Sequence, residues 1–429
     1  MKRKLHIVFI AVMVTVMSVL AGCNTEAGKG NGPTEIEFWY SLGGELGKVL
    51  QEQVKQFNES QNEVKVKAVF QGDYYENHQK LLTSIAAKNA PDVSMIEVAS
   101  VASFADNGVL ENLKPYAEGK NGTDEQDFVK GLMGNSYYKG QWVAVPYNRS
   151  TPLLYVNKDM LKKAGLNPEG PKTWEELRQY AQKLTQKNGN QVTRWGFETP
   201  IDIWFYEGLV FQNGGRILSE DGKQPMFNQP DAVEPVKFWN ELIYQDKTMK
   251  MPPGEKYNAW DVAKSDFINQ KVAMIFTSTG DLRYLSDQAK FEVGTAFMPK
   301  QKTYGAPTGG ANLVMLATSP KEEKEAAWKF IKWMTETEQT IQFSQKTGYM
   351  PVRQSAIDSE EMKAYYKENP NFKVAVDQLQ YAQPRPVSPA YKELQETIMK
   401  EIQRSIVNNQ DPQKALNDAA GKAKNVLNK

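Results

Sequence analysis

The stretch Pro146–Asp159 constrains the fold more than any other part of the sequence. It opens with a proline-bounded polar segment, which favours a loop, and runs into apolar residues 153–156, which favour a buried strand. Residues 157–159 then give a helix-start signal. This succession is typical of a segment that crosses between two domains, with Asn148 and Ser150 offering polar side chains at the crossing. An ordinary buried strand after a turn has the same pattern.

Strand and helix patterns alternate on both sides of this stretch. Ahead of it the order favours βαβ units in a largely parallel sheet. Behind it the same order resumes, with a loop expected at 308–311. We therefore expect two α/β lobes, the first formed by 34–154 and 303–346 and the second by 155–302 and 347–429. The strands are expected at 35–40, 64–70, 93–96, 153–156, 271–277, 291–297 and 312–317.

Residues 1–22 have the pattern of a signal peptide. Three basic residues precede an apolar run that is too short for a permanent membrane span, and small residues lead to Cys23. This arrangement resembles the lipobox of bacterial lipoproteins, which implies a Cys23 thiol that carries lipid such as palmitate. A plain signal peptide with an incidental cysteine is the alternative. Residues 23–33 are rich in glycine and asparagine and predict a flexible tether.

Composition argues against several classes of function. The formal net charge of +1 becomes −2 without the three basic residues of the leader, so nucleic acid is not an expected partner. His78 is the only histidine after the leader, and its polar neighbours favour a solvated helix position over a catalytic role. Because Cys23 is the only cysteine and no phosphate-loop, dinucleotide or calcium motif occurs, we expect no metal and no cofactor.

An ordered set of short motifs resembles one protein family. The motifs are Phe38-Trp-Tyr-Ser, Gly44-Glu-Leu-Gly47, Gly72-Asp-Tyr74, Asn89-Ala-Pro91, Asn148-Arg-Ser-Thr-Pro152, Tyr155-Val-Asn-Lys-Asp159, Lys172-Thr-Trp174, Gly309-Gly310-Ala311 and Lys346-Thr-Gly-Tyr-Met-Pro351. Over nearly its whole length the chain resembles the solute-binding proteins of bacterial ABC importers in the sugar-transport branch, above all the glycerol-3-phosphate-binding lipoproteins. The resemblance implies a two-lobe α/β fold of the type II periplasmic-binding class, with the ligand cleft between the lobes and no enzymatic activity.

The resemblance also implies which residues touch the ligand. Tyr74, Glu97, Ser150, Gly309 and Tyr349 match the family's motifs in place and type. The further expected contacts are Gly310, Arg385, and a hydroxyl from Ser278 or Thr279. A guanidinium, hydroxyls and backbone amides suit a phosphate, while a carboxylate accepts hydrogen bonds from a polyol.

Each of these positions also has an ordinary structural interpretation. Tyr74 and Tyr349 have the character of core aromatics, Glu97 of a helix N-cap, and Ser150 of a turn residue. Gly309 and Gly310 would likewise suit a hairpin turn. The segment around Arg385 departs from the family pattern and is closer to the Arg-Pro segment of general sugar binders. Candidates for stacking on a sugar are Trp204 and Trp260, although core positions are commoner for tryptophan.

Three functions remain open on this basis. The first is a lipid-anchored, monomeric receptor on the outer face of the cell membrane that delivers glycerol-3-phosphate, or a related glycerophospho compound, to ABC permease subunits and their ATPase. The second is the same kind of receptor for a maltose-like di- or oligosaccharide. The third is a surface-tethered glycan-degrading enzyme, which the lack of a usable histidine and of metal ligands disfavours.

Overall fold

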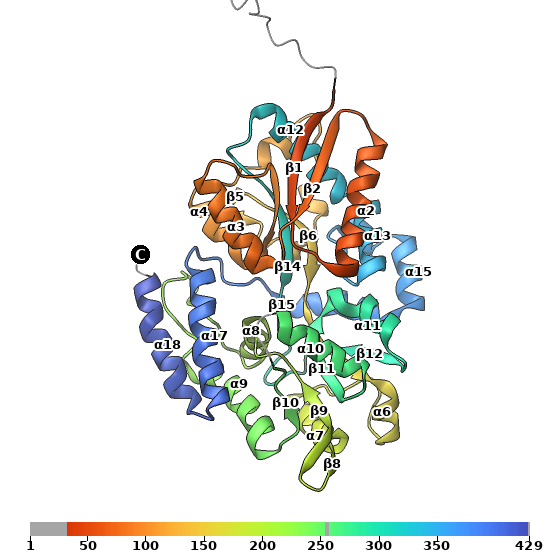
Figure 1. Cartoon of the computed structure of the whole chain (residues 1–429), viewed down its shortest axis with the longest axis vertical. Helices are drawn as coiled ribbons and strands as arrows, with labels where there is room; N and C mark the ends of the chain where they lie inside the picture. Colours follow the sequence, from red (N-terminus) through yellow and green to blue (C-terminus); the bar gives the residue numbers. More distant parts are fainter. Residues whose placement is uncertain (1–31, 254–256, 428–429) are drawn as a thin grey trace, which may run out of the picture.

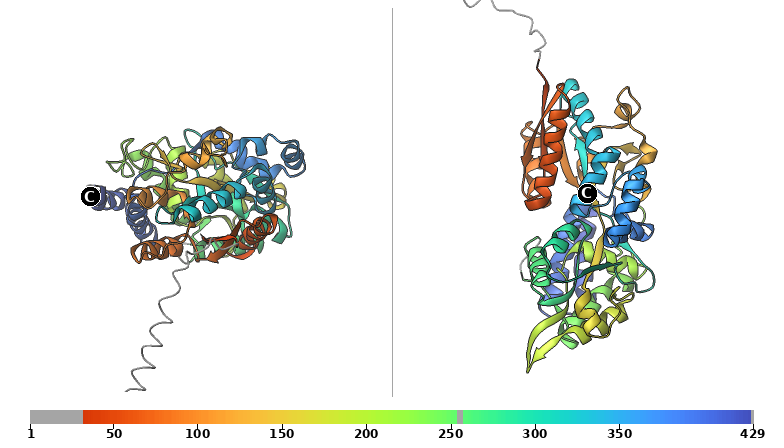
Figure 2. Two further views of the ribbon diagram at one scale, coloured as in Figure 1. Left: turned by 90° about the horizontal axis from the view of Figure 1, so that it is seen from above. Right: turned by 90° about the vertical axis from the view of Figure 1, so that its right-hand side faces the viewer.

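The computed structural model describes residues 32–253 and 257–427, which form two lobes stacked along the long axis of the molecule (Figures 1 and 2). The predicted leader, the predicted lipidation site Cys23 and most of the predicted tether lie outside the described residues. Each lobe is built around one sheet. Within the described ranges, no helix combines the length and the apolar character needed to cross a membrane.

The first lobe is built on a five-stranded sheet in the order β2-β1-β3-β14-β6. Strand β1 pairs in parallel with β2 and β3, whereas β14 is antiparallel to both β3 and β6. The expectation of a largely parallel sheet is confirmed, because β2, β1, β3 and β6 run in the same direction. Only β14, which returns from far along the chain, enters the sheet in the opposite direction. The strands are β1 (Thr34–Tyr40), β2 (Val64–Phe70), β3 (Val93–Glu97), β6 (Val145–Ser150) and β14 (Gly309–Met315).

Helices cover both faces of this sheet because its strands alternate apolar residues between the two sides. Phe38 of β1 packs against Phe330 with ring centroids 5.2 Å apart, while Ile96 of β3 faces Leu81 and Phe104 on the other side. The helices are α2 (Gly44–Ser60), α3 (Tyr74–Ala86), α4 (Val101–Asp106), α5 (Lys114–Ala117), α12 (Lys321–Met334) and α13 (Thr337–Thr347). Smaller elements are β4 (Tyr137–Tyr138), β5 (Gln141–Trp142), and the 3₁₀ turns η1 (Val98–Ser100), η2 (Glu125–Asp127) and η3 (Lys130–Leu132).

The second lobe contains a mixed sheet in the order β10-β9-β11-β7-β12, with β8 paired to β9. Strands β9, β10 and β11 are parallel, and β7 is antiparallel to β11 and β12. The strands are β7 (Pro152–Asn157), β8 (Gln186–Asn188), β9 (Gln191–Glu198), β10 (Met249–Lys250), β11 (Val272–Ser278) and β12 (Val293–Ala296). The helices are α6 (Lys158–Lys163), α7 (Trp174–Leu184), α8 (Ile203–Gln212), α9 (Pro230–Asn240), η4 (Glu241–Gln245), α10 (Tyr257–Ile268), η5 (Thr279–Asp281) and α11 (Leu282–Gln288).

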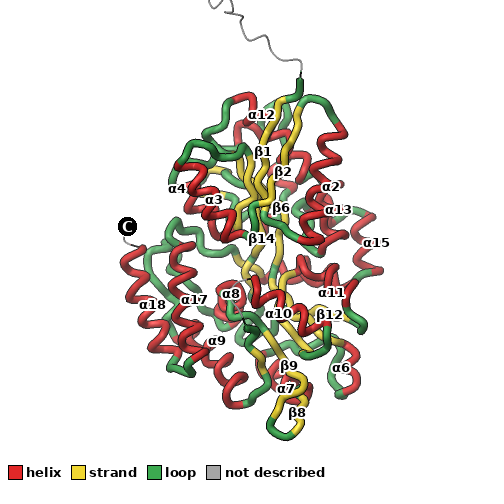
Figure 3. The backbone as a smooth tube through the Cα atoms, in the orientation of Figure 1, coloured by secondary structure: helices red, strands yellow, loops and turns green. Residues whose placement is uncertain are grey.

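The chain crosses from the first sheet to the second at Thr151, which separates β6 from β7 (Figure 3). The predicted crossing is confirmed, and Asn157 caps α6 by accepting a hydrogen bond from the Met160 amide. The loop predicted before the crossing is wrong, because 145–150 is a fully buried strand paired with β14. The predicted lobe boundary at 154/155 falls inside β7, and the domain limits remain predictions.

The loop predicted at 308–311 is also wrong. Gly309 and Gly310 begin β14 and pair with Ser150 and Arg149, and a bulge follows Gly310. The φ of Gly310 is +82°, and a Cβ there would lie 1.8 Å from the Asn148 carbonyl oxygen. Only glycine fits such a backbone without rearrangement, so this pair serves a bulged strand rather than a turn.

The chain after residue 347 contacts both lobes. The Met350 amide donates to the Arg149 carbonyl oxygen in the first lobe, whereas Asn371 bonds to Val293 and Thr295 in the second. The last two helices pack along the second lobe beside α8 and α9 (Figure 1). The elements are α14 (Gln354–Ile357), α15 (Glu360–Glu368), α16 (Pro370–Gln378), η6 (Leu379–Tyr381), β15 (Ala382–Gln383, paired with β13, Ala306–Pro307), α17 (Tyr391–Val407) and α18 (Pro412–Leu427).

Candidate functional site

Arg385 joins carboxylates from the two lobes. It lies on the segment between β15 and α17, and its side chain is buried. Its Nε and Nη2 donate to the two oxygens of Glu207 on α8, each at 2.9 Å. Its Nη1 donates to Glu97 Oε1 at 2.6 Å, at the end of β3. The guanidinium is therefore shared by a carboxylate of the first lobe and one of the second, in the bidentate geometry that arginine favours.

Glu97 has two cationic partners. Besides Arg385, it accepts a hydrogen bond from Lys392 Nζ at 2.5 Å. Burial alone would raise the pKa of Glu97, but Lys392 and Arg385 outweigh it and lower that pKa to about 2. Glu97 is the first residue before η1, yet its side chain makes no capping hydrogen bond. Glu97 therefore occupies the N-cap position of η1, but its carboxylate does not cap this turn and is held ionised at the lobe interface.

The sequence interpretation missed Glu207. It is completely buried, and it accepts hydrogen bonds from Arg385 and from the Tyr391 hydroxyl. Burial raises its pKa, while Arg385 and Tyr391 act in the opposite direction. A signal was present, because Glu207 is the only charged residue in the otherwise apolar helix α8. A lone acid in a helix that is buried all round requires a partner.

An aromatic group lies beside this cluster. Trp204 and Trp260 stack with ring centroids 5.8 Å apart and planes at 20°. Tyr257 forms an edge contact with Tyr74 at 6.3 Å, which links α10 of the second lobe to α3 of the first. Asp202 caps α8 and accepts a hydrogen bond from Trp260 Nε1 at 3.3 Å. Both tryptophans therefore face the interface as well as the second-lobe core, while Asp202 and Tyr257 were not anticipated.

Tyr74 and Tyr349 lie at the same interface around Asn148. Asn148 Nδ2 donates to the Tyr74 hydroxyl at 2.6 Å, and Asn148 Oδ1 is buried without a hydrogen-bond partner among the described residues. Burial and then the neighbouring Tyr349 raise the pKa of Tyr74 well above its usual value. Burial also raises the pKa of Tyr349 to about 12, and its ring stacks on Phe343 at 5.7 Å. Both phenols therefore stay protonated at neutral pH and can donate hydrogen bonds.

The predicted hydroxyl and glycine contacts are distributed around these tyrosines. Ser150 lies opposite Gly309 in the β6–β14 ladder, so it is a strand residue and not a turn residue. Ser278 uses its hydroxyl to accept the Gly280 amide at 3.1 Å. In contrast, Thr279 Oγ1 is buried without a partner among the described residues. Of the two alternatives for one contact, Thr279 therefore has the uncommitted hydroxyl.

Two glycines allow aromatic rings to lie directly on the backbone. A Cβ on Gly309 would be 2.4 Å from Trp204 Cζ2, and a Cβ on Gly280 would be 2.6 Å from Tyr349 Cζ. Because these distances are far below van der Waals contact, any side chain at either position would displace the ring. The glycines thus allow the Trp204 ring to lie close to the backbone of β14 and the Tyr349 ring close to the backbone of η5.

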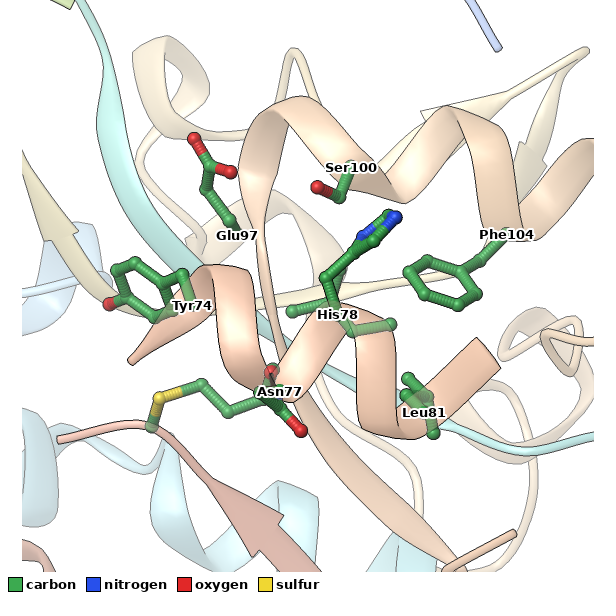
Figure 4. Close-up of a pocket in the computed structure, with 9 residues that line it drawn as sticks. Tyr74, Asn77, His78, Leu81, Glu97, Ser100 and Phe104 are labelled. Carbon is green, nitrogen blue, oxygen red and sulfur yellow. Dashed lines mark hydrogen bonds between the residues drawn. The ribbon is translucent and has the colours of Figure 1, made fainter. Parts of the chain in front are cut away.

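His78 packs in a small pocket behind Tyr74 and Glu97. Its ring meets Phe104 edge-on at 4.9 Å and lies near Ser100 (Figure 4). Burial and, secondarily, Lys392 lower the pKa of His78 to about 4. The expectation of a solvated histidine is therefore wrong, because helix α3 turns this side chain towards α4. His78 is neutral at physiological pH.

The family of the chain follows from comparison with known proteins. A family model described as bacterial extracellular solute-binding protein matches residues 52–374. The chain therefore belongs to this family, whose members act outside the cytoplasm as small-molecule receptors of ABC transporters and are not enzymes. This confirms the predicted family and the exclusion of an enzyme.

Within this family, the chain is similar to proteins that bind glycerol-3-phosphate. The sn-glycerol-3-phosphate-binding periplasmic protein of Salmonella typhimurium is 29% identical over 413 residues, which cover 92% of each chain. The corresponding protein of Escherichia coli K12 is 28% identical over 423 residues, 93% of this chain and 94% of that protein.

Solved structures confirm the two-lobe type II fold. UgpB from Mycobacterium tuberculosis in complex with glycerophosphocholine is 28% identical with a TM-score of 0.82, and the match covers 93% of this chain and 99% of that one. Maltose-bound MalE3 from T. maritima is 26% identical with a TM-score of 0.80, covering 91% and 99% of the two chains. Structural likeness therefore extends to relatives with phosphorylated ligands and to relatives with sugars.

Proposed function

We propose that the chain is a lipid-anchored, monomeric receptor of an ABC importer that captures sn-glycerol-3-phosphate or a related glycerophospho compound between its lobes. It would deliver this ligand to the permease subunits and their ATPase from the outer face of the cell membrane. The anchor would be Cys23, which precedes the described residues. Changing Cys23 to serine should then release the protein from the membrane fraction, and retention of that variant would contradict the anchor.

The observation that supports this ligand class is the position of the Arg385 cluster between the lobes. Arg385 and Glu97 link the second lobe to the first, so a ligand that contacts them stabilises one relative position of the lobes. The interface also offers the protonated Tyr74 and Tyr349 hydroxyls and the uncommitted Thr279 hydroxyl. Hydroxyl donors suit phosphate oxygens, and the Glu97 carboxylate suits the hydroxyls of a glycerol. The relatives at 28–29% identity that carry glycerol-3-phosphate in their names support the same class.

Charge balance at the interface favours a glycerophosphodiester with a cationic head group over glycerol-3-phosphate itself. Arg385 and Lys392 are matched by Glu97 and Glu207, so this cluster has no surplus positive charge for a doubly charged phosphate. Asp202 adds a carboxylate beside stacked aromatic rings. A carboxylate next to indole faces suits a quaternary ammonium group, such as that of glycerophosphocholine.

A maltose-like sugar is the second candidate ligand. The Trp204–Trp260 stack offers aromatic surface for a sugar ring, and the similarity to maltose-bound MalE3 is consistent with such a ligand. The neutral sum of charges around Arg385 is compatible with an uncharged ligand.

Isothermal titration calorimetry of the purified protein distinguishes these ligands. We expect heat of binding with glycerophosphocholine, weaker binding with sn-glycerol-3-phosphate, and none with maltose or maltotriose. Thermal denaturation gives a second readout, since ligand at 100 times its Kd should add about 2.7 kcal/mol to the free energy of unfolding. Binding of maltose without either phosphate compound would replace the proposed ligand class with the sugar.

A further inference from the structure

Arg149 is a buried cation without a carboxylate partner. Its exposed fraction is 0%, and within the described part of the chain it forms no ion pair. Its Nε donates to the Gly309 carbonyl oxygen at 2.9 Å, and its Nη1 donates to Leu132 O at 2.6 Å and Asn312 Oδ1 at 3.0 Å. Nη2 is buried with no acceptor among the described residues. Neutral oxygens thus orient the guanidinium but do not cancel its charge.

Other buried arginines are compensated. Arg385 has two carboxylates within 2.9 Å. Arg353, which is 3% exposed, lies 3.8 Å from Asp127 and places its guanidinium 3.6 Å from the Phe128 ring centroid. Because burying an unpaired charge destabilises a folded chain, Arg149 is costly where it lies. We therefore look for a role of the Arg149 charge in ligand binding and not in the stability of the fold.

The position of Arg149 connects it to the proposed ligand site. It lies between Asn148 and Ser150 on β6, opposite Gly310, and its side chain holds the Gly309 carbonyl. Its own carbonyl oxygen accepts the amide of Met350, the residue after Tyr349. Backbone or side-chain neighbours of Arg149 thus include most of the first-lobe contacts predicted for the ligand.

We propose that Arg149 supplies the positive charge that favours the phosphate group of a ligand at this interface, acting through its electric field and not through direct contact. The proposal rests on the proposed function, because it concerns the same site. The cations of the Arg385 cluster are neutralised by Glu97 and Glu207, whereas the charge of Arg149 is not. In a buried, weakly polarisable environment such a charge acts over several ångströms without contact.

The test compares charge removal with charge retention at this position. Arg149→Met removes the charge and keeps most of the length, while Arg149→Lys keeps the charge with fewer hydrogen bonds. Arg353→Met is the matched control, because it removes a buried arginine that packs against Thr335 and Asp127 of the first lobe and whose charge is compensated. Calorimetry with glycerophosphocholine and sn-glycerol-3-phosphate is combined with thermal unfolding of each ligand-free protein.

We expect Arg149→Met to weaken binding of both compounds by about 10- to 100-fold, and the doubly charged glycerol-3-phosphate more than the diester. Arg149→Lys should remain within several-fold of the wild type. The ligand-free Arg149→Met and Arg149→Lys proteins should both lose some heat stability, because each substitution takes donors from the buried oxygens of Gly309, Leu132 and Asn312. The effect of the charge is therefore the difference in affinity between these two variants. Arg353→Met should unfold at a lower temperature and bind both compounds normally.

Two results overturn the proposal on its own: equal affinity of wild type and Arg149→Met for both compounds, or equal weakening in Arg149→Met and Arg149→Lys. If the wild type binds neither phosphate compound but binds maltose, the proposed ligand class and this proposal fail together. Whether the wild-type protein binds the phosphate compounds therefore shows which proposal has failed: the ligand class, or the role of Arg149 alone.

Discussion

Arg385 and Arg149 are both withdrawn from solvent near the lobe interface, yet their surroundings are opposite. Arg385 is enclosed by the carboxylates of Glu97 and Glu207, which come from different lobes. Arg149 lies within one sheet and meets only carbonyl and amide oxygens. An arginine paired with carboxylates, such as Arg385, links structural elements through ion pairs. An arginine without a carboxylate partner among the described residues, such as Arg149, leaves a positive electrostatic potential around it. Both arginines are buried, so the presence or absence of a carboxylate partner is what distinguishes the structural role of Arg385 from the electrostatic role proposed for Arg149.

Breaking the ion pair between Arg385 and Glu207 should give the largest effect, a decrease in the free energy of unfolding. Glu207→Gln removes the bidentate carboxylate and leaves Arg385 with Glu97 alone. Breaking a buried pair by removing one partner costs about 3–5 kcal/mol. Urea-induced unfolding should report this loss in the free energy of unfolding.

The matched control for Glu207 is Glu220, which pairs with Arg216 at 2.8 Å on the surface. Glu220→Gln should change the free energy of unfolding by less than about 0.5 kcal/mol. A cost for Glu207→Gln as small as that of Glu220→Gln would remove the distinction between the two buried arginines.

The next effect is a dependence of stability on pH that comes from Glu97. Its pKa in the folded protein, about 2, lies below its unfolded value, so its contribution is fully present above about pH 4.5. The contribution is lost as the pH falls towards 2, and its size is on the order of 3 kcal/mol. The difference in unfolding free energy between the wild type and Glu97→Gln should therefore change steadily as the pH falls from 4.5 to 3. A difference that stays constant over this range would show that Glu97 is not held ionised by Arg385 and Lys392.

The smallest effect is on ligand affinity when Arg385 itself is changed. Arg385→Ala should weaken binding of glycerophosphocholine by about 1.5–3 kcal/mol, roughly 10- to 150-fold, since it removes a charge-assisted contact and frees Glu97. Calorimetry measures this directly, and Arg385→Lys serves as a variant that retains the charge. Equal affinity of wild type and Arg385→Ala would contradict the ligand contact predicted for Arg385.

Local patterns predicted the elements whose partners are close in sequence. The alternation at 35–40 identified β1, and Asn157 marked the start of α6, because such signals depend on neighbouring residues. Val145–Ser150 was misread as a loop, because its strand partner β14 is about 160 residues further along the chain. The residues next to β6 in the sequence give no information about its pairing with β14.

The same limit applies to the site. Motif resemblance selected Glu97 and Arg385, and the structure places them in contact. It did not select Glu207, which is joined to Arg385 only by the packing of α8 against the segment after β15. Nor did it select the charge of Arg149, whose importance depends on the absence of an acidic neighbour among the described residues. Such an absence becomes visible only in three dimensions.

The position of β14 has a consequence for how the chain is made. In the first sheet β14 lies between β3 and β6, and it is the strand through which β6 joins β1, β2 and β3. A chain synthesised from its N-terminus cannot complete this sheet until residues 309–315 have left the ribosome. Until then β3 and β6 keep unpaired edges, and the first lobe stays unfinished for most of translation. The late synthesis of this one central strand thus delays completion of the first sheet until about three quarters of the chain has been made.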